Sequence, residues 1–311
     1  MYKYLKTIGV IALTFLIAVG CSTEKPGSNN ANNDDEPKDD IKIGLSISTL
    51  DNPFFVTLRD GAEAAAEKED FEVISSDAQD DSSTQLDDVE DMIQQDIDIL
   101  LINPADSDAV VSAIELANDE DIPVITVDRE SEGGDVVTHI ASDNVEGGEM
   151  AAEYIDEELD GKGNLVELEG VSGASATRER GEGFHNVIDD NDDFDLVSQQ
   201  SADFDRTEGL SVMENILQSD DDIDAVFAHN DEMALGAVEA LESKDMLDDV
   251  TIVGFDATDD GQEAVEDGKM DASIAQQPEL IGETSIEEAE KVVNGEEVDD
   301  FIPVDLEMLD E

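Results

Sequence analysis

Short apolar runs and longer amphipathic stretches alternate along the chain from residue 41 almost to its end. The apolar runs are bounded by turn-forming residues, which is typical of buried strands. We predict strands at 41–48, 71–75, 97–102, 123–127, 136–141, 163–168, 195–200, 224–228, 249–254 and 271–275. Apolar residues recur at helical spacing between them, and we predict helices at 53–69, 82–95, 107–119, 145–159, 175–190, 207–218, 232–243, 259–267 and 279–294. This alternation is typical of α/β proteins with parallel sheets and right-handed crossovers.

The predicted helix 53–69 has a clear beginning and a clear buried face. Asn52 is a good N-cap, and Pro53 fits the first helical position. Its apolar side chains form one stripe, made by Phe55, Leu58, Ala62, Ala65 and Ala66. The predicted strand 97–102 is apolar at almost every position instead, as expected for a strand buried on both faces.

The number of predicted strands bears on the domain organisation. About ten strands are more than one sheet with a single core usually holds. We therefore predict two similar, doubly wound lobes of about five or six strands each. No repeat with a fixed period of about 20–50 residues is present, so a solenoid or a propeller is not expected.

The charge is far from zero, with 84 acidic and 15 basic side chains and a net charge of -69 over 311 residues. A field this negative repels phosphates, so nucleic acid is excluded as a partner. Acidic chains with few aromatic residues can be disordered, but here 39% of the residues are hydrophobic and periodically arranged. We interpret the acidic surface as an adaptation to concentrated salt, which screens the self-repulsion.

The N-terminal residues have the pattern of a targeting segment. Lys3 and Lys6 precede an apolar stretch at 8–19 that is too short for an ordinary membrane span. The stretch ends before Cys21 in a way that resembles a bacterial lipoprotein signal, so we predict a signal at 1–20 and a lipid on Cys21. An incidental cysteine in an ordinary signal peptide is the alternative. The polar residues that follow, up to residue 40, predict a flexible acidic tether.

Polar or aromatic side chains follow the predicted strands, where parallel α/β sheets bind their ligands. The residues at these positions are Asn52, Phe54, Phe55, Asn103, Asp128, Arg129, Asn230, Phe255, Asp256 and Gln276. They come from both halves of the chain, so we expect one site between the lobes. Carboxylates, amides and guanidinium groups suit the hydroxyls of a sugar, and aromatic rings suit its C–H faces. The set contains no nucleophile or metal-ligand cluster, so we expect neither an enzyme nor a cofactor.

Several of these residues have simpler interpretations when each is taken alone. Phe54 and Phe55 begin a helix and could be core residues. Asn103 before Pro104 could form a turn, and Asn230 could be an N-cap. Of the five arginines, we assign Arg129 and Arg180 to the ligand, whereas Arg178 and Arg206 are expected to pair with acids or helix ends. The joint placement at strand ends favours the sugar site.

Motifs of common enzymes and nucleotide-binding proteins are absent. The chain has no G-x-x-x-x-G-K-[ST] loop for phosphates. The stretch 170–174 misses the G-x-S-x-G nucleophile motif at its last position. The acidic stretches 189–195 and 220–224 lack the glycine and the terminal glutamate of a calcium loop, and we interpret them as solvated surface.

Long stretches of the chain match one family in order. They are STLDNPFFVTLRDGA, LLINPADSDAV, IPVITVDRE, HIASDNVEGG, RERGEGF, ADFDR, HNDEMALGA, VGFDAT and IAQQPELIG. From Ile41 to about Leu306 the chain resembles the D-ribose-binding proteins of bacterial ABC importers. The resemblance implies two lobes, 41–142 plus 277–304 and 143–276 plus 305–311, which are joined by three crossing strands.

The resemblance also implies which residues contact the sugar. The family's contacts fall on the strand-end residues named above, on Arg180 and on Phe204, and Ser48 matches a further pocket position. The sequence departs from the family pattern at Asp51, where asparagine is common, and at His229, where glutamine is common. Neither departure removes a sugar contact, although Asp51 could alter the field beside Asn52.

The resemblance implies a monomeric, lipid-anchored receptor that captures D-ribose by hinge closure and delivers it to an ABC permease. Its place would be the outer face of the cytoplasmic membrane or the periplasm. Another monosaccharide, such as allose or galactose, and a sensory subunit for chemotaxis are the alternatives. A two-lobe gene repressor does not fit, because a signal and a tether occupy the place of its DNA-binding module.

Overall fold

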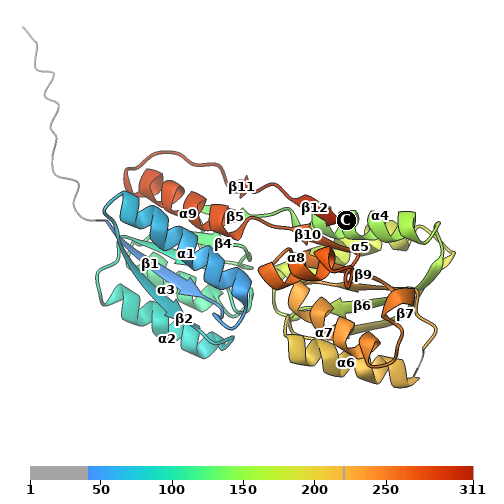
Figure 1. The fold of residues 1–311 in the computed structure, drawn as a ribbon. Helices are drawn as coiled ribbons and strands as arrows, with labels where there is room; N and C mark the ends of the chain where they lie inside the picture. Colours follow the sequence, from blue (N-terminus) through green and yellow to red (C-terminus); the bar gives the residue numbers. More distant parts are fainter. Residues whose placement is uncertain (1–40, 220, 311) are drawn as a thin grey trace, which may run out of the picture. The chain divides into compact units, whose positions relative to one another are not determined.

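The computed structural model describes residues 41–219 and 221–310, which form two α/β lobes, each built on a six-stranded sheet (Figure 1). The predicted signal at 1–20, Cys21 and the tether up to residue 40 lie outside the described residues. The predicted fold class, two similar lobes with mostly parallel sheets, is confirmed.

The first lobe has the strand order β11-β5-β4-β3-β1-β2, and all its pairings are parallel. Its strands are β1 (Lys42–Ile47), β2 (Glu72–Asp77), β3 (Ile99–Ile102), β4 (Val124–Val127), β5 (Thr138–Ala141) and β11 (Phe301–Pro303). Its helices are α1 (Pro53–Lys68), α2 (Ser82–Ile93), α3 (Val111–Asp119) and α9 (Pro278–Val293).

The second lobe repeats this arrangement with the order β12-β10-β9-β8-β6-β7, in which only the β10–β12 pairing is antiparallel. Its strands are β6 (Gly163–Glu169), β7 (Phe194–Ser201), β8 (Ala225–Ala228), β9 (Thr251–Asp256), β10 (Ala272–Ala275) and β12 (Glu307–Asp310). Its helices are α4 (Asn144–Glu158), α5 (Ser175–Ile188), α6 (Arg206–Ser219), α7 (Asp231–Glu242), α8 (Asp259–Glu266) and the short 3-10 helix η1 (Leu247–Asp249).

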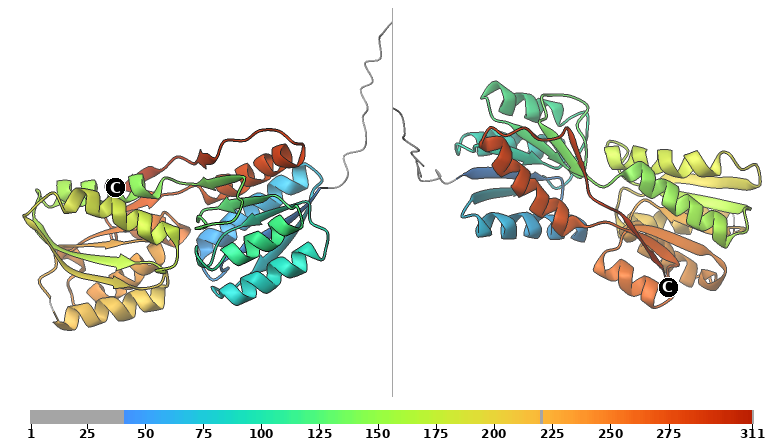
Figure 2. Two further views of the ribbon diagram at one scale, coloured as in Figure 1. Left: turned by 180° about the vertical axis from the view of Figure 1, so that it is seen from behind. Right: turned by 90° about the horizontal axis from the view of Figure 1, so that it is seen from above.

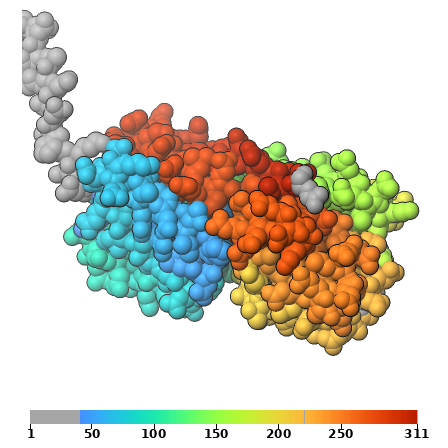
Figure 3. Space-filling view, in the orientation of Figure 1, coloured from blue at the N-terminus to red at the C-terminus, as the bar shows by residue number. Residues whose placement is uncertain are grey.

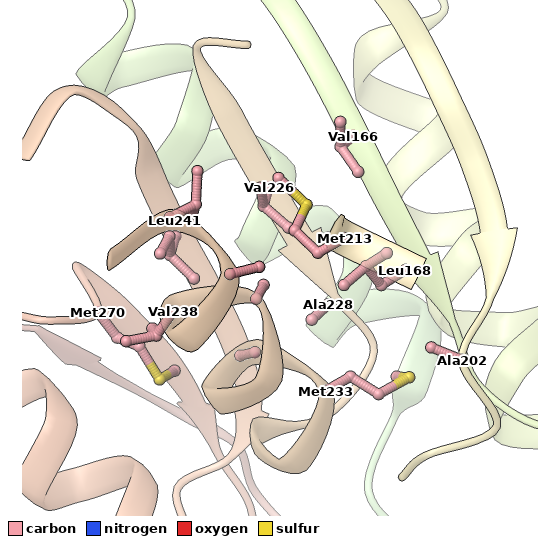
Figure 4. Packing of buried hydrophobic residues seen from close by; sticks show 14 of the residues in the cluster. Val166, Leu168, Ala202, Met213, Val226, Ala228, Met233, Val238, Leu241 and Met270 are labelled. Atoms are coloured by element: carbon pink, nitrogen blue, oxygen red, sulfur yellow. The ribbon is translucent and has the colours of Figure 1, made fainter. Parts of the chain in front are cut away.

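Each central strand is buried on both faces, as its apolar sequence predicts. In β3, Ile99 and Leu101 pack with α1 and α9, whereas Leu100 and Ile102 pack with α2 and α3. The second lobe has the same layers, and Figure 4 shows Val166 of β6 among the side chains that pack on the α6 and α7 face. Burying a Leu, Ile or Val side chain contributes about 1.5–3 kcal/mol, so these layers hold the strand ends in place.

The chain passes between the lobes three times. The connections are β5 to α4, β10 to α9 and β11 to β12 (Figure 2). Each is only a few residues long, which matches the three crossing strands that the sequence resemblance implied. Among the described residues, no helix is both long enough and apolar enough to span a membrane.

Two features of the secondary structure differ from the prediction. The helix predicted at 107–119 begins only at Val111, because the Asp106 carboxylate accepts hydrogen bonds from the backbone N–H groups of Asp108 and Ala109 and forms a turn. The edge strands β11 and β12 were not predicted. They are three and four residues long and mostly exposed, so they lack the apolar pattern of the central strands.

Candidate ligand-binding site

A cavity between the lobes, with about 240 Å³ of space free of protein atoms, is lined by residues from both of them. Ten of the thirteen predicted ligand-binding residues line it: Asn52, Phe54, Phe55, Asp128, Arg129, Arg180, Phe204, Asn230, Asp256 and Gln276. Ala176 is the one lining residue that the sequence did not suggest. The parallel strands bring these residues together, because their carboxyl ends lie at one edge of each sheet.

The other three predicted residues lie close by but do not line the cavity. Asn103 is fully buried and donates to the Val127 carbonyl at 3.0 Å and to the Asp128 carboxylate at 3.4 Å. Ser48 donates its backbone N–H to the Asn103 side chain at 3.2 Å. The Phe255 ring lies under the Arg180 guanidinium, 3.8 Å from the ring centroid. Whether these three contact a ligand stays a prediction.

Two buried acid–base pairs give the cavity its charge balance. Arg129 Nε lies 3.9 Å from Asp128 Oδ2, and Arg180 Nη1 lies 3.7 Å from Asp256 Oδ1. All four side chains are at least 95% buried, and neither distance is short enough for a hydrogen bond. The pairs therefore keep hydrogen-bonding capacity for a third partner.

Burial shifts the pKa of each charged group towards the neutral form. Loss of solvent raises the pKa of the Asp128 and Asp256 carboxyls, and the neighbouring arginines oppose this effect. Loss of solvent likewise lowers the pKa of the Arg129 and Arg180 guanidinium groups, against the pull of the two carboxylates. A ligand that offers hydroxyls to both signs of charge would offset this cost.

Two polar atoms in the lining have no hydrogen-bond partner among the described residues. These atoms are Arg129 Nε and Gln276 Oε1, and both are buried. The other end of the Gln276 amide donates to Asp256 Oδ1 at 2.9 Å, so the amide orientation is fixed. A buried polar atom without a partner costs about 1–3 kcal/mol, so a hydrogen bond from a ligand to either atom would be favourable.

Aromatic rings hold the two guanidinium groups. The Arg129 guanidinium lies 5.0 Å from the ring centroid of Phe55 and 5.3 Å from that of Phe204. Phe204 has a left-handed backbone with a φ of 59°, and its ring lies directly over Gly170, where any side chain would overlap it. Gly170 is therefore required for the position of this ring.

The asparagines of the site are also helix caps. Asn52 Oδ1 accepts from the Phe54 N–H at 2.9 Å, which confirms the predicted cap of α1. Asn230 Oδ1 accepts from the Met233 N–H at 3.0 Å, and its amide donates to the Phe204 carbonyl at 3.2 Å. Phe54 and Phe55 belong to the core and to the cavity lining alike. The simpler interpretations of these residues are thus compatible with a place in the site.

Two residues that the sequence did not assign to the site, Asn144 and His229, hold Arg180 in place. Asn144 Oδ1 accepts from Arg180 Nε at 2.9 Å, and the His229 carbonyl accepts from Arg180 Nη1 at 2.5 Å. Asn144 follows β5, so its place after a strand was the signal that could have identified it. The other three arginines form ion pairs as well: Arg59 with Asp60, Arg178 with Glu132, and Arg206 with Glu232 and Asp260.

Direct hydrogen bonds also join the two lobes beside the cavity. The backbone N–H of Ser107 donates to the Gly173 carbonyl at 2.9 Å. Ser107 Oγ accepts from the Ser175 N–H at 3.1 Å, and Ser175 Oγ accepts from the Glu130 N–H at 2.8 Å. The N-cap residue of α5, Ala174, makes no side-chain cap, so Ser107 of the opposite lobe supplies one. We call Ser107, Glu130, Gly173 and Ser175 the serine latch.

A larger groove, with about 1340 Å³ of space free of protein atoms, lies outside the cavity, between the beginnings of α1, α8 and α9. Figure 3 shows the blue surface of the first lobe meeting the orange surface of the second lobe. The groove shares Phe54, Asp256 and Gln276 with the cavity, but the two arginines do not line it. The cavity that both arginines line is therefore the better candidate for a ligand site.

Comparison with known proteins now places the chain. The family model of the periplasmic binding protein domain matches residues 43–297. The chain belongs to the periplasmic binding protein family. The resemblance to ribose-binding proteins is confirmed as well: the ribose import binding protein RbsB of Bacillus subtilis is 50% identical over 299 residues, which is 96% of each chain. RbsB of Escherichia coli is 49% identical over 86% of this chain and 90% of its own length.

Solved structures of periplasmic binding proteins share the fold. An ABC transporter solute binding protein from Bacillus halodurans with bound myo-inositol is 37% identical, with a TM-score of 0.83, over 87% of this chain and 94% of its own. A periplasmic solute binding protein from Actinobacillus succinogenes with bound D-allose is 31% identical, with a TM-score of 0.82, over 87% and 97%. Within the described residues of this periplasmic binding protein, no group of three His, Cys, Asp or Glu side chains is arranged to hold a metal ion.

Proposed function

We propose that this periplasmic binding protein captures D-ribose between its lobes and delivers it to the permease subunits of an ABC importer. The observation that carries the proposal is the cavity lined by two buried Asp–Arg pairs and three aromatic rings, contributed by both lobes. The names of the relatives at about 50% identity support ribose as the sugar. The protein acts as a binding protein and not as an enzyme.

The sugar would lie with its faces towards the rings of Phe54, Phe55 and Phe204. Its hydroxyls would donate to Asp128 and Asp256 and accept from Arg129 and Arg180. The amides of Asn52, Asn230 and Gln276 would complete the hydrogen bonds, with Ser48, Asn103 and Phe255 contributing to the same pocket. This arrangement matches donors with acceptors around a neutral ring that has several hydroxyls.

Capture would proceed by hinge closure around the three connections between the lobes. Each lobe carries half of the site, so only a closed form contacts the sugar from both sides. The sugar contacts would stabilise that form, which the permease would then recognise. The lobes would be 41–142 plus 277–304 and 143–276 plus 305–311, as the sequence predicts.

The rest of the prediction concerns the setting of the protein. We propose that a lipid on Cys21, after a signal at 1–20, anchors the monomeric protein to the outer face of the cytoplasmic membrane or in the periplasm. The tether up to residue 40 would separate it from the membrane. The net charge of -69 supports a habitat of concentrated salt and no nucleic-acid partner.

A second candidate function is binding of another monosaccharide. The solved relative with bound D-allose supports this alternative, because its fold is the same and it is 31% identical. Presentation of the sugar to a chemotaxis receptor would use the same site and would be compatible with transport.

Calorimetry in molar salt tests the proposal. The chain without residues 1–21 keeps every described element, and it would be titrated with D-ribose and then with allose, arabinose, xylose, galactose and glucose. We expect one-to-one binding of ribose, with the other sugars at least about a hundredfold weaker (about 2.8 kcal/mol). Absence of ribose binding by folded protein would refute ribose, and absence of binding to any of these sugars would refute the sugar site.

Two variants test the site itself. Arg180→Ala and Asp256→Ala each leave a buried partner charge unpaired, so each should weaken ribose binding at least about tenfold. Circular dichroism and thermal unfolding establish that the variants are folded. Wild-type affinity in both variants would contradict the assignment of this cavity.

A further inference from the structure

Besides the two carboxylates in the cavity lining, a further buried carboxylate lies behind the lining, at the beginning of α7. Asp231 is fully buried, follows the lining residue Asn230 and does not line the cavity itself. A buried carboxylate requires hydrogen bonds to compensate for lost solvation. Its two oxygens accept three of them, and all three donors lie on the segments around Asp256 and Gln276.

These hydrogen bonds fix the residues that follow β9. Asp231 Oδ2 accepts from the Thr258 N–H at 2.7 Å and from Thr258 Oγ1 at 3.2 Å. Asp231 Oδ1 accepts from Ser273 Oγ at 2.6 Å, and Ser273 Oγ in turn accepts from the Ala257 N–H at 3.1 Å. The carboxylate therefore holds the two residues that follow Asp256: Thr258 directly, and Ala257 through Ser273.

The backbone that is held in this way is strained. Asp256 has a φ of 105° and Ala257 a φ of 49°, both in the region that side chains other than glycine rarely adopt. Such conformations cost about 1–3 kcal/mol each and persist only where the surroundings enforce them. The strain turns the chain at the end of β9, from which the Asp256 carboxylate reaches the cavity.

Space for the Asp231 carboxylate is built into the fold. A side chain at Gly261, in the first turn of α8, would overlap the Asp231 carboxylate. Thr258 caps this helix through its hydroxyl, which accepts from the Gly261 N–H at 3.2 Å. The carboxylate thus lies between the beginnings of α7 and α8, and it joins both to the end of β9.

The charges around the two carboxylates are unbalanced. Asp256 is influenced by Arg180, Asp231 and Asp128, and it accepts a hydrogen bond from Gln276. The charges of Asp231 and Asp256 repel each other, and the charge of Glu232 raises the pKa of Asp231. Arg180 is the cation that is attracted to both Asp231 and Asp256. Burial raises the pKa of Asp256, and the charge of Asp231 raises it further against the pull of Arg180. Burial also raises the pKa of Asp231, while the hydrogen bonds from Ser273 and Thr258 lower it.

We propose that Asp231 is a positioning residue that fixes Asp256 for the sugar and sets the pH range in which the site binds. The inference rests on the proposed function, because it concerns the affinity of the same site. Asp231 acts by holding the strained segment 256–258 and by placing a negative charge behind the carboxylate that accepts the sugar hydroxyls. Neither effect requires contact between Asp231 and the sugar.

The test compares Asp231→Asn with Asp259→Asn in D-ribose titrations from pH 5 to 9 in molar salt. Asp259 is an exposed acid in the first turn of α8, so its variant removes the same charge nearby without the hydrogen bonds to Thr258 and Ser273. We expect Asp231→Asn to raise the Kd at least about tenfold at pH 7 and Asp259→Asn to leave it within about twofold. We also expect the loss of affinity at acidic pH to move to lower pH in Asp231→Asn, because a neutral neighbour makes Asp256 easier to ionise.

A purely structural role would raise the Kd equally at every pH, so an unchanged pH profile overturns the proposal. Carbon NMR of the Asp256 carboxyl in sugar-free protein provides a second readout, and its titration should also move to lower pH in Asp231→Asn. If Asp231→Asn does not fold, Ser273→Ala removes the donor to Asp231 Oδ1 and the acceptor of the Ala257 N–H while it keeps the hydrogen bonds from Thr258. This variant should raise the Kd severalfold, and an unchanged Kd there overturns the proposal. If the wild-type protein binds no sugar, the proposed function is refuted. If the wild-type protein binds sugar and the Asp231→Asn variant binds it equally well, only the inference about Asp231 is refuted.

Discussion

Substitution of Ser107 by alanine should weaken sugar binding through closure alone. Ser107 is fully buried in the serine latch, where its hydroxyl accepts from the Ser175 N–H of the opposite lobe at 3.1 Å. Ala174 supplies no side-chain cap for α5, so the variant leaves this N–H without its side-chain acceptor in the closed form. In an open form, water would satisfy the same group in wild type and variant alike.

The magnitude follows from the capping energy. Loss of a helix N-cap or of a buried acceptor costs about 1–2 kcal/mol. Because the cost applies to the closed form only, it reduces the population of that form and raises the apparent Kd by the same factor. About 1.4 kcal/mol corresponds to a tenfold change, so we expect the Kd for D-ribose to rise between about fivefold and thirtyfold. The backbone bond from Ser107 to Gly173 stays, which limits any wider rearrangement.

Calorimetry with D-ribose in molar salt measures the effect, and Ser112→Ala is the matched control. Ser112 is an exposed serine in α3 of the same lobe, so its variant removes a hydroxyl without touching the latch. Thermal unfolding of the sugar-free proteins should be nearly the same for both variants. A Kd for Ser107→Ala within about twofold of the control would refute the contribution of the latch to closure.

Two further predictions concern the Phe204 ring and the buried histidine His139. Gly170→Ala places a methyl group where the Phe204 ring lies, and the displaced ring should cost about 1–3 kcal/mol and raise the Kd about tenfold or more, as measured by sugar titration. A Kd for Gly170→Ala equal to that of the wild type would contradict the close packing of the Phe204 ring on Gly170. Burial lowers the pKa of His139 to about 4, so stability from its neutral ring is complete above about pH 6.5 and is lost as the pH falls to about 4. The free energy of unfolding, measured with a chemical denaturant at pH 4 and 7, should therefore fall by about 3 kcal/mol less in His139→Gln than in the wild type. An equal fall in both proteins would refute the prediction.

The sequence predicted which residues lie together around the cavity, because the candidate residues follow strands. Asp128, Arg129 and Asp256 come directly after apolar runs, and a parallel sheet places such ends at one edge whatever the details of packing. Ala176 could not be predicted in this way, because a methyl group in a helix carries no chemical signal. Its place in the lining depends only on how α5 lies against the cavity.

The contacts that the sequence did not predict are those between distant segments. Ser107 and Ser175 are 68 residues apart, and nothing in either neighbourhood indicates the other. The sequence around Asp231 does not indicate its role either, since its partners Thr258 and Ser273 lie on distant segments. The strands β11 and β12 were missed for a related reason: their pairing partners, and not their own short sequences, determine that they are strands.

Salt screens the charges on the surface much more than the buried charges of the site. The acids that give the chain its net charge of -69 are mostly solvent-exposed, and molar salt screens their repulsion within about 3 Å. The cavity contains two carboxylates and two guanidinium groups that are at least 95% buried, where salt screens much less. The balance inside the cavity therefore has to come from the protein itself, through Arg129 and Arg180, and not from the solvent. This separation explains how a chain with so few basic residues can retain two arginines in one cavity while its surface is strongly acidic.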